Sequence, residues 1–230
     1  GLVVPFAAEM RQESAGPETL VYSITPAPNT PMGVYPVRVW TSEGISNLRL
    51  LLVTDVPVLV AKEPNGQYKS GRLDLEQAQR IDYPVVIAAG RLASDIDSFR
   101  FTATAGQRLV FETMNWRTGL TPEPMLRLWD SRARRLAEQH DTPGLHMDER
   151  LDFTFPETGD YFVELQAFRV AGWNNHTLLK IGPANYARAV FPLGGRRGEK
   201  LRFQIVDHDG NTTELNAQVP EEPWIDHWYL

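Results

Sequence analysis

The chain has 230 residues, of which 42% are hydrophobic and 23% are charged, as is typical of a globular rather than a disordered protein. Its net charge of −6 and the lack of any basic block argue against a nucleic-acid partner. The absence of cysteine excludes disulfides, thiolate metal sites and cysteine nucleophiles, and no apolar run approaches the roughly 20 residues of a transmembrane segment.

The first 55 residues are predicted to be β structure. In residues 20–24, 35–39 and 48–52, every second side chain is a large apolar or aromatic one. This period of two is typical of a strand with one buried face. Three prolines and Gly33 predict a turn after the first of these ranges, and 42–45 predicts a hairpin turn. Residues 56–84 are predicted to be a connector, in which 73–80 is expected to form two turns of helix that end before Pro84.

Residues 85–183 carry the strongest β pattern. Phe99 and Phe101 share one face of a predicted strand, and Leu109 and Phe111 share one face of the next, with Gly106 in the turn between them. Short strands with a turn signal every 8–15 residues favour an all-β fold, a jelly-roll β-sandwich. The predicted strands are 85–92, 97–104, 108–115, 125–130, 151–155, 159–168 and 177–181.

Residues 184–230 begin a new β segment with an alternating strand at 201–205. Residues 207–211 resemble the start of an EF-hand loop, but Gln218 occupies the twelfth position, where that loop needs a glutamate. A hairpin turn at Asp209 and Gly210 is therefore the preferred interpretation.

Several motifs, taken in order, resemble a bacterial family. Residues 58–182 are similar to the pre-peptidase C-terminal (PPC) domain family, and the similarity is carried by 62–65, 90–101, 104–111, 141–144 and 150–161. The resemblance implies a jelly-roll module without catalytic activity in an exported protein, located in the periplasm, at the cell surface or outside the cell. It implies other domains of the parent protein as partners, together with polysaccharide or matrix protein.

The flanking segments look like incomplete immunoglobulin-like domains. Residues 1–55 resemble the later strands and residues 184–230 the early strands of such a domain. A half sandwich exposes an apolar face and unpaired strand edges. We therefore expect that the two segments can pair into one composite sandwich, within one chain or between two.

The resemblance also implies a calcium site between the connector and the start of the second strand. Its candidate ligands are Glu63, Asn65 and Asp97, followed by Asp95. Calcium-binding relatives have a further glutamate where this chain has Ala61, and often an acid or amide where it has Gly66. The alternative interpretation is a simple turn at 64–66 with aspartates that cap loops.

Two other groups of residues are candidates for a site. His140, Asp141 and His146 form the one cluster of histidine and carboxylate in the sequence and are the candidates for a metal-dependent hydrolase centre, although a solvated loop is the better interpretation of them. Trp116, Trp129 and Trp173 fall at strand ends or loops, where exposed rings bind sugars or peptides, unless they pack on the sandwich. Three functions therefore remain open: an accessory module, a polysaccharide- or matrix-binding module, and a hydrolase.

Overall fold

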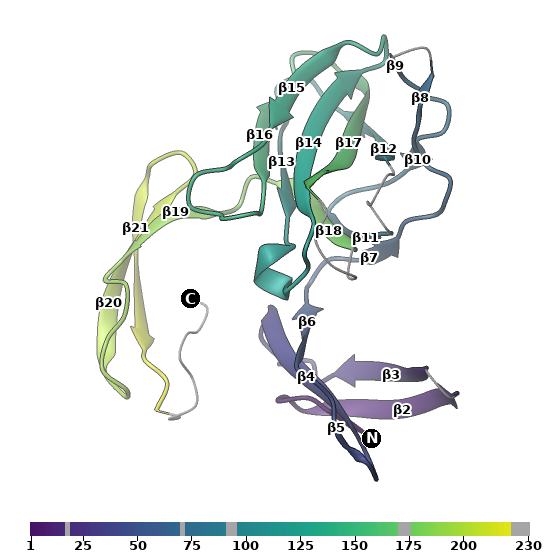
Figure 1. The fold of residues 1–230 in the computed structure, drawn as a ribbon. Helices are drawn as coiled ribbons and strands as arrows, with labels where there is room; N and C mark the ends of the chain where they lie inside the picture. The colour runs from purple at the N-terminus through teal and green to yellow at the C-terminus, as the bar shows by residue number, and fades with distance from the viewer. Residues whose placement is uncertain (17–18, 70–71, 91–95, 170–175, 222–230) are drawn as a thin grey trace.

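The structure, a computed structural model, describes residues 1–16, 19–69, 72–90, 96–169 and 176–221. It is built from strands with a single 3₁₀ turn, η1 (Trp116–Thr118), so the predicted all-β class is confirmed (Figure 1). No helix in the described ranges has the length and apolar character that crossing a membrane requires.

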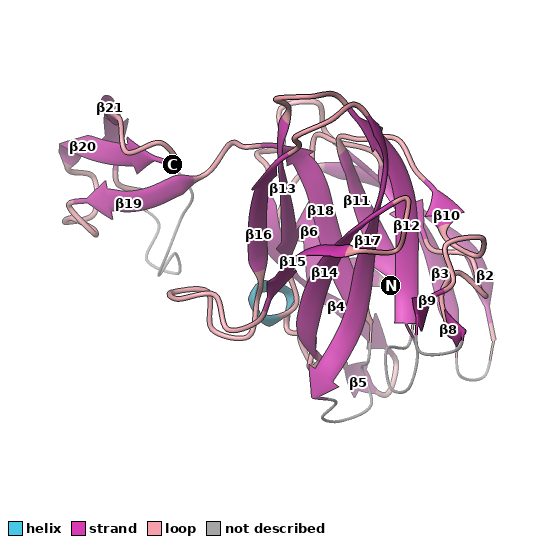
Figure 2. Cartoon of the chain, turned by 90° about the horizontal axis from the view of Figure 1, so that it is seen from above, coloured by secondary structure: helices cyan, strands magenta, loops and turns pink. Residues whose placement is uncertain are grey.

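The centre of the chain is a jelly roll of eight consecutive strands. One sheet has the order β16-β13-β18-β11 and the other the order β12-β17-β14-β15, and all these pairs are antiparallel (Figure 2). This alternation of strands between two facing sheets is the jelly-roll topology predicted from the turn spacing. The strands are β11 (Val85–Ala89), β12 (Ile96–Ala103), β13 (Arg108–Thr113), β14 (Glu123–Asp130), β15 (Arg135–Gln139), β16 (Arg150–Thr154), β17 (Gly159–Arg169) and β18 (Thr177–Pro183).

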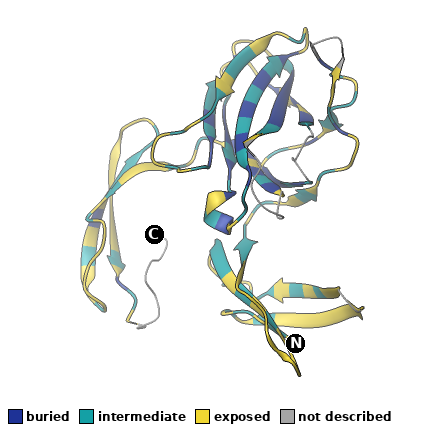
Figure 3. Cartoon of the chain, in the orientation of Figure 1, coloured by how far each residue is buried: buried dark blue, intermediate teal, exposed yellow. Residues whose placement is uncertain are grey.

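Aromatic side chains fill the space between the two sheets. Figure 3 shows that buried residues concentrate on the strands of the sandwich. Phe99, Phe101, Phe111 and Phe155 are all fully buried, and the Phe101 ring centroid lies 5.4 Å from that of Phe111 and 5.7 Å from that of Phe155. Each such ring contributes about 1.5–3 kcal/mol to folding through the apolar area that it removes from water. The alternation read from the sequence thus identifies the core-facing side of β12 and β13.

One strand of the jelly roll, β15, was not predicted from the sequence. Strand β15 lies at a sheet edge and buries only part of Leu136 and Ala137, while Arg135 and Glu138 are exposed. A bulge between Leu128 and Trp129 also shifts its register with β14. An edge strand with one weak apolar face leaves little periodic signal.

The connector contributes strands rather than a helix. The expected helix at 73–80 was wrong, because Leu73 ends a short hairpin and Gln79 and Arg80 pair in parallel with β12. The Asp74 side chain accepts a hydrogen bond from the Glu76 amide, which closes a turn between them. An isolated two-turn helix is marginal, so pairing with a sheet edge prevails. The connector strands are β7 (Val58–Val60), which pairs with β11, β8 (Tyr68–Lys69), β9 (Arg72–Leu73) and β10 (Gln79–Arg80).

The two flanking segments each pair only within themselves over the described residues. The hairpin turn at Asp209 and Gly210 is confirmed, and the Asp207 carboxylate accepts hydrogen bonds from the amides of Asp209 and Asn211 there. No ladder joins the two segments in the described chain, and their pairing with each other stays a prediction. Their strands are β1 (Leu2–Val3), β2 (Ala8–Ala15), β3 (Leu20–Pro26), β4 (Gly33–Thr41), β5 (Gly44–Ile45), β6 (Arg49–Val53), β19 (Ala187–Phe191), β20 (Lys200–Asp207) and β21 (Thr212–Gln218).

Candidate functional site

The connector crosses from one sheet of the sandwich to the other just after β7. The Ala61 amide donates to the carbonyl of Ala88 on β11, and four residues later Asn65 lies against β12 of the opposite sheet. There the Asn65 carbonyl accepts hydrogen bonds from the Ser98 amide (3.2 Å) and the Ser98 hydroxyl (2.6 Å). These bonds fix residues 63–66 over the beginning of β12.

Three of the four predicted calcium ligands meet at this crossing. The Asn65 amide nitrogen donates to Asp97 Oδ1 at 2.7 Å and to Glu63 Oε1 at 3.4 Å. Asn65 and Asp97 are each only 1% exposed, whereas Glu63 is exposed. The fourth candidate, Asp95, lies outside the described residues. We call Glu63, Asn65 and Asp97 the oxygen cluster.

The side-chain oxygen of Asn65 is the feature of the oxygen cluster that points to a metal ligand. Asn65 Oδ1 is buried and has no hydrogen-bond partner in the described part of the chain. A buried acceptor without a donor costs about 1–3 kcal/mol. A half-turn of the carboxamide about its last torsion exchanges Oδ1 with the amide nitrogen and brings Oδ1 beside both carboxylates. In that orientation the cluster offers two carboxylates and one amide oxygen, the kinds of donor that Ca²⁺ prefers.

The two departures from the calcium-binding pattern have structural reasons. Ala61 packs against the hydrophobic core and offers no oxygen. A Cβ atom on Gly66 would lie 2.2 Å from the Ile96 carbonyl oxygen, so the close approach of the two backbones leaves no room for a side chain. Neither position therefore supplies a side-chain ligand to the oxygen cluster.

The predicted histidine cluster is divided between two places. His140 lies beside Asp141, with 3.1 Å between Nδ1 and Oδ2, and beside Glu123, with 3.5 Å between Nε2 and Oε1. His146 instead packs against Trp116 with the two rings tilted by 31° and 5.5 Å between their centroids. Glu123 was missed in the sequence because its proximity to His140 depends on the pairing of β14 with β15, and β15 was not predicted.

The buried carboxylates near these residues hold loops in place. Asp148 is fully buried and accepts hydrogen bonds from the amides of Trp116 and Arg117 and from the Arg117 guanidinium. Glu149, also fully buried, accepts from the amides of Asp141 and Thr142. Both groups therefore secure the chain at η1 and at the loop that follows β15.

The candidate tryptophans do not form one binding platform in the described structure. Trp116 lies on η1 and is 50% exposed. Trp129 is on the outer face of β14, where its indole nitrogen donates to the buried Glu164 carboxylate at 2.8 Å. Trp129 lies six residues after the start of β14, about 20 Å along the strand at ~3.3 Å per residue, whereas η1 precedes that strand. Trp173 lies outside the described residues.

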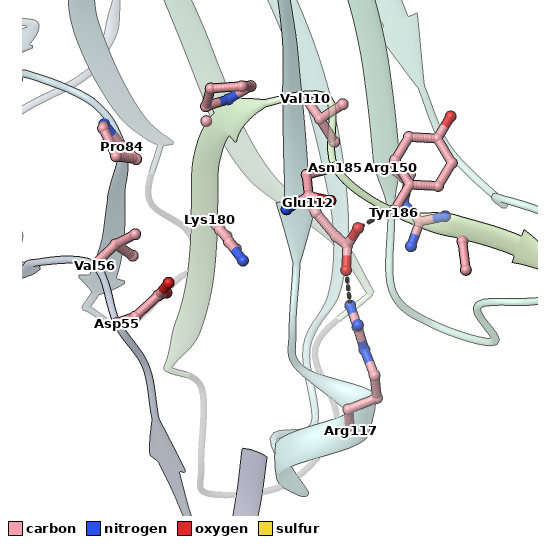
Figure 4. A pocket seen from close by; sticks show the side chains of 13 residues that line it. Asp55, Val56, Pro84, Val110, Glu112, Arg117, Arg150, Lys180, Asn185 and Tyr186 are labelled. Atoms are coloured by element: carbon pink, nitrogen blue, oxygen red, sulfur yellow. Dashed lines mark hydrogen bonds and ion pairs between the residues drawn. The ribbon is translucent and has the colours of Figure 1, made fainter. Parts of the chain in front are cut away.

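A cavity of about 390 Å³ lies over the outer face of β13, β16 and β18, between the linkers on either side of the sandwich (Figure 4). At the base of the cavity, the Glu112 carboxylate forms ion pairs with the guanidinium groups of Arg150 (2.5 Å) and Arg117 (2.7 Å). Burial acts to raise the pKa of Glu112, but the two guanidinium groups outweigh it and hold the pKa below its usual value. The described residues that line the cavity include neither a histidine nor a serine, so the nucleophile and base of acyl transfer are not paired there.

No protein-family model and no curated protein sequence matches the chain.

Proposed function

We propose that this chain is a non-catalytic accessory module of a larger exported protein, where it serves in adhesion, spacing or stabilisation. In this proposal the jelly roll is a PPC-like domain, and Ca²⁺ bound by Glu63, Asn65 and Asp97 stabilises the connector. The observation that carries the proposal is the buried carboxamide of Asn65, whose Oδ1 has no hydrogen-bond partner among the described residues and whose amide nitrogen lies beside two carboxylates. The topology of the sandwich supports it, because the acidic connector motif and the start of β12 meet as the resemblance implies.

Calcium would act on the connector rather than on a substrate. Glu63 and Asn65 belong to the connector, while Asp97 belongs to the sandwich. A divalent cation between them ties the two together and fixes the direction in which the chain leaves β7. Such a clip suits a spacer, because it limits movement of the connector against the sandwich. Extracellular calcium modules bind with dissociation constants of about 0.1–1 mM, which suits a small set of side-chain ligands.

The polar groups of the sandwich also support a structural role. Asp148, Glu149 and Glu164 are fully buried carboxylates, and each accepts hydrogen bonds from several donors. Buried charges with this many partners are held in fixed positions. Their protein partners occupy the lone pairs that a general base would need for substrate.

A melting experiment tests the calcium site. We expect the melting temperature of the full chain to rise by several degrees between a chelator and 10 mM CaCl₂, since a ligand that binds only the folded state stabilises it by RT ln(1 + [L]/Kd). Glu63→Gln should remove most of this rise, because it removes one carboxylate ligand. Glu63 is exposed, so its replacement leaves the core intact. Glu76→Gln, a change of an exposed acid on the same connector, should retain it. Equal melting of the wild type in calcium and chelator would overturn the site.

A second function is favoured by the half-exposed ring of Trp116. His146 packs against this indole at a tilt, and the half-exposed ring presents an aromatic surface to solvent of the kind that binds sugar rings. We therefore propose polysaccharide or matrix protein as a ligand of this end of the sandwich. Retention of the wild type on immobilised polysaccharide or collagen, and loss of retention in Trp116→Ala, is the expected result. Equal retention of both proteins would contradict it.

A further inference from the structure

A second group of metal-binding side chains lies at the end of the sheet formed by β12, β17, β14 and β15. Glu123 is the first residue of β14, and His140 and Asp141 directly follow β15, its antiparallel neighbour. One ligand atom from each of the three residues lies within 4.8 Å of the other two. The oxygen cluster takes its ligands from other residues, so this group is separate from the proposed calcium site.

The imidazole of His140 is held in one orientation from two sides. Its Nδ1 lies 3.1 Å from Asp141 Oδ2, and its ring centroid lies 4.1 Å from that of Phe168. A metal-binding imidazole usually has a carboxylate beside the ring nitrogen that does not touch the metal. This arrangement of carboxylate, histidine and metal is common around zinc.

The other ring nitrogen has the geometry of a metal ligand. His140 Nε2 is buried and has no hydrogen-bond partner among the described residues, although it faces Glu123 Oε1 at 3.5 Å. At bond lengths of about 2.0–2.1 Å, two ligands of a tetrahedral zinc ion lie about 3.3 Å apart. The separation in this protein is therefore close to that of two ligands on one ion.

We propose that His140 Nε2 and Glu123 form a site for a zinc-class transition metal, with Asp141 as the positioning residue on Nδ1. Imidazole nitrogen favours zinc, copper or nickel over calcium, which prefers oxygen. The bound ion ties the loop after β15 to the start of β14. That loop also carries His146, so the metal steadies the residue that packs against Trp116. The remaining coordination positions go to water.

Binding of Zn²⁺ to the metal-stripped full chain, measured by isothermal titration calorimetry at fixed calcium, tests the proposal. We expect one site in the wild type, at least tenfold weaker binding in His140→Gln and in Glu123→Gln, and unchanged binding in His146→Gln. Co²⁺ gives an independent readout, because an imidazole-bound tetrahedral Co²⁺ ion absorbs visible light. This absorption should be present in the wild type and His146→Gln and absent in His140→Gln.

Asp141→Asn should weaken binding less than loss of either ligand does, because Asp141 acts through His140. Circular dichroism and melting of each variant distinguish loss of the site from loss of the fold, and Glu123→Gln provides a second test if His140→Gln does not fold. Undetectable Zn²⁺ binding by the wild type would overturn the proposal. So would wild-type affinity in both folded ligand variants, or a loss of binding in His146→Gln equal to that in His140→Gln.

Discussion

The Tyr68 hydroxyl donates a hydrogen bond to Glu164, with 2.8 Å between the Tyr68 oxygen and Glu164 Oε1, although 96 residues separate the two in the sequence. Glu164 belongs to β17 and is fully buried, with Tyr68 of β8 among the side chains that contact its carboxylate. Arg127 and Trp129 from β14 donate to the same carboxylate. This contact adds to the strand pairing that secures the connector to the sandwich.

The Tyr68 contact predicts a loss of stability at alkaline pH. Burial and the neighbouring Glu164 carboxylate raise the pKa of Tyr68 from 10.0 to about 12. Below pH 10 both the folded and unfolded chains hold the proton, so the contribution of Tyr68 is fully present. Between pH 10 and 12 the unfolded chain releases the proton first, and the free energy of unfolding falls.

Urea denaturation of the wild type and Tyr68→Phe at pH 9 and pH 11 measures this effect. The variant should be less stable at pH 9 by about 1 kcal/mol, the typical value of one hydrogen bond. The difference between the two proteins should shrink at pH 11. An equal difference at both pH values would contradict the assignment.

Replacement of Gly66 by alanine should destabilise the chain. The new Cβ would lie 2.2 Å from the Ile96 carbonyl oxygen, so either the connector or β12 must move. We expect a cost of about 1–3 kcal/mol, the usual range for overpacking, and a weaker calcium response because Asn65 is the adjacent residue. Gly159→Ala is the matched control, since nothing lies within 4 Å of its Cβ position and its cost should stay within about 0.5 kcal/mol. Chemical denaturation with and without calcium checks both expectations.

Loss of the Asp148 carboxylate should also destabilise the sandwich. Asp148→Ala removes the acceptor for the amides at the start of η1 and leaves the Arg117 guanidinium with one carboxylate fewer. Breaking a buried charged pair on one side costs about 3–5 kcal/mol. Asp82→Ala, at an exposed aspartate, should change stability by less than about 0.5 kcal/mol. Similar melting temperatures for the two variants would show that the Asp148 contacts do not support η1.

Arg108 joins the sandwich to the C-terminal sheet. Its guanidinium forms a two-pronged pair with Asp152 at 2.7 and 2.8 Å and also contacts Asp209 in the β20–β21 turn. Arg108→Gln should free the C-terminal sheet and increase the radius of gyration measured by small-angle scattering, with little change in the melting of the sandwich. Arg202→Gln, which removes an ion pair within that sheet, is the control. Identical scattering from Arg108→Gln and the wild type would contradict this role.

The same contact should be sensitive to acid. Burial acts to raise the pKa of Asp152, but hydrogen bonds from Arg108 and Tyr186 outweigh it and hold the pKa below its usual value. Its stabilising contribution is therefore present above about pH 4 and is lost as pH falls through the lower pKa of the folded state. The radius of gyration of the wild type should rise towards that of Arg108→Gln over this acidic range. A constant radius down to the pH at which the chain unfolds would contradict it.

The sequence pattern was sufficient to predict a strand and its buried face where that strand has one strongly apolar face. Phe99 and Phe101 on β12, and Leu109 and Phe111 on β13, alternate regularly, and all four are fully buried. Alternation with a period of two follows from backbone geometry, which makes it readable in a single strand. Strand β15 and the strands of the connector were missed because their stability comes from neighbours rather than from their own pattern.

By itself, the sequence determined the all-β class, the core of the sandwich and the residue types of the proposed calcium site. Only the tertiary structure decided which of these residues meet. It brought Asn65 to Asp97 across 32 positions, placed Glu123 beside His140, and moved His146 to Trp116. The physical reason is that periodicity reports which side of a strand is buried, whereas a site depends on which strands become neighbours, and that is set by pairing between distant parts of the chain.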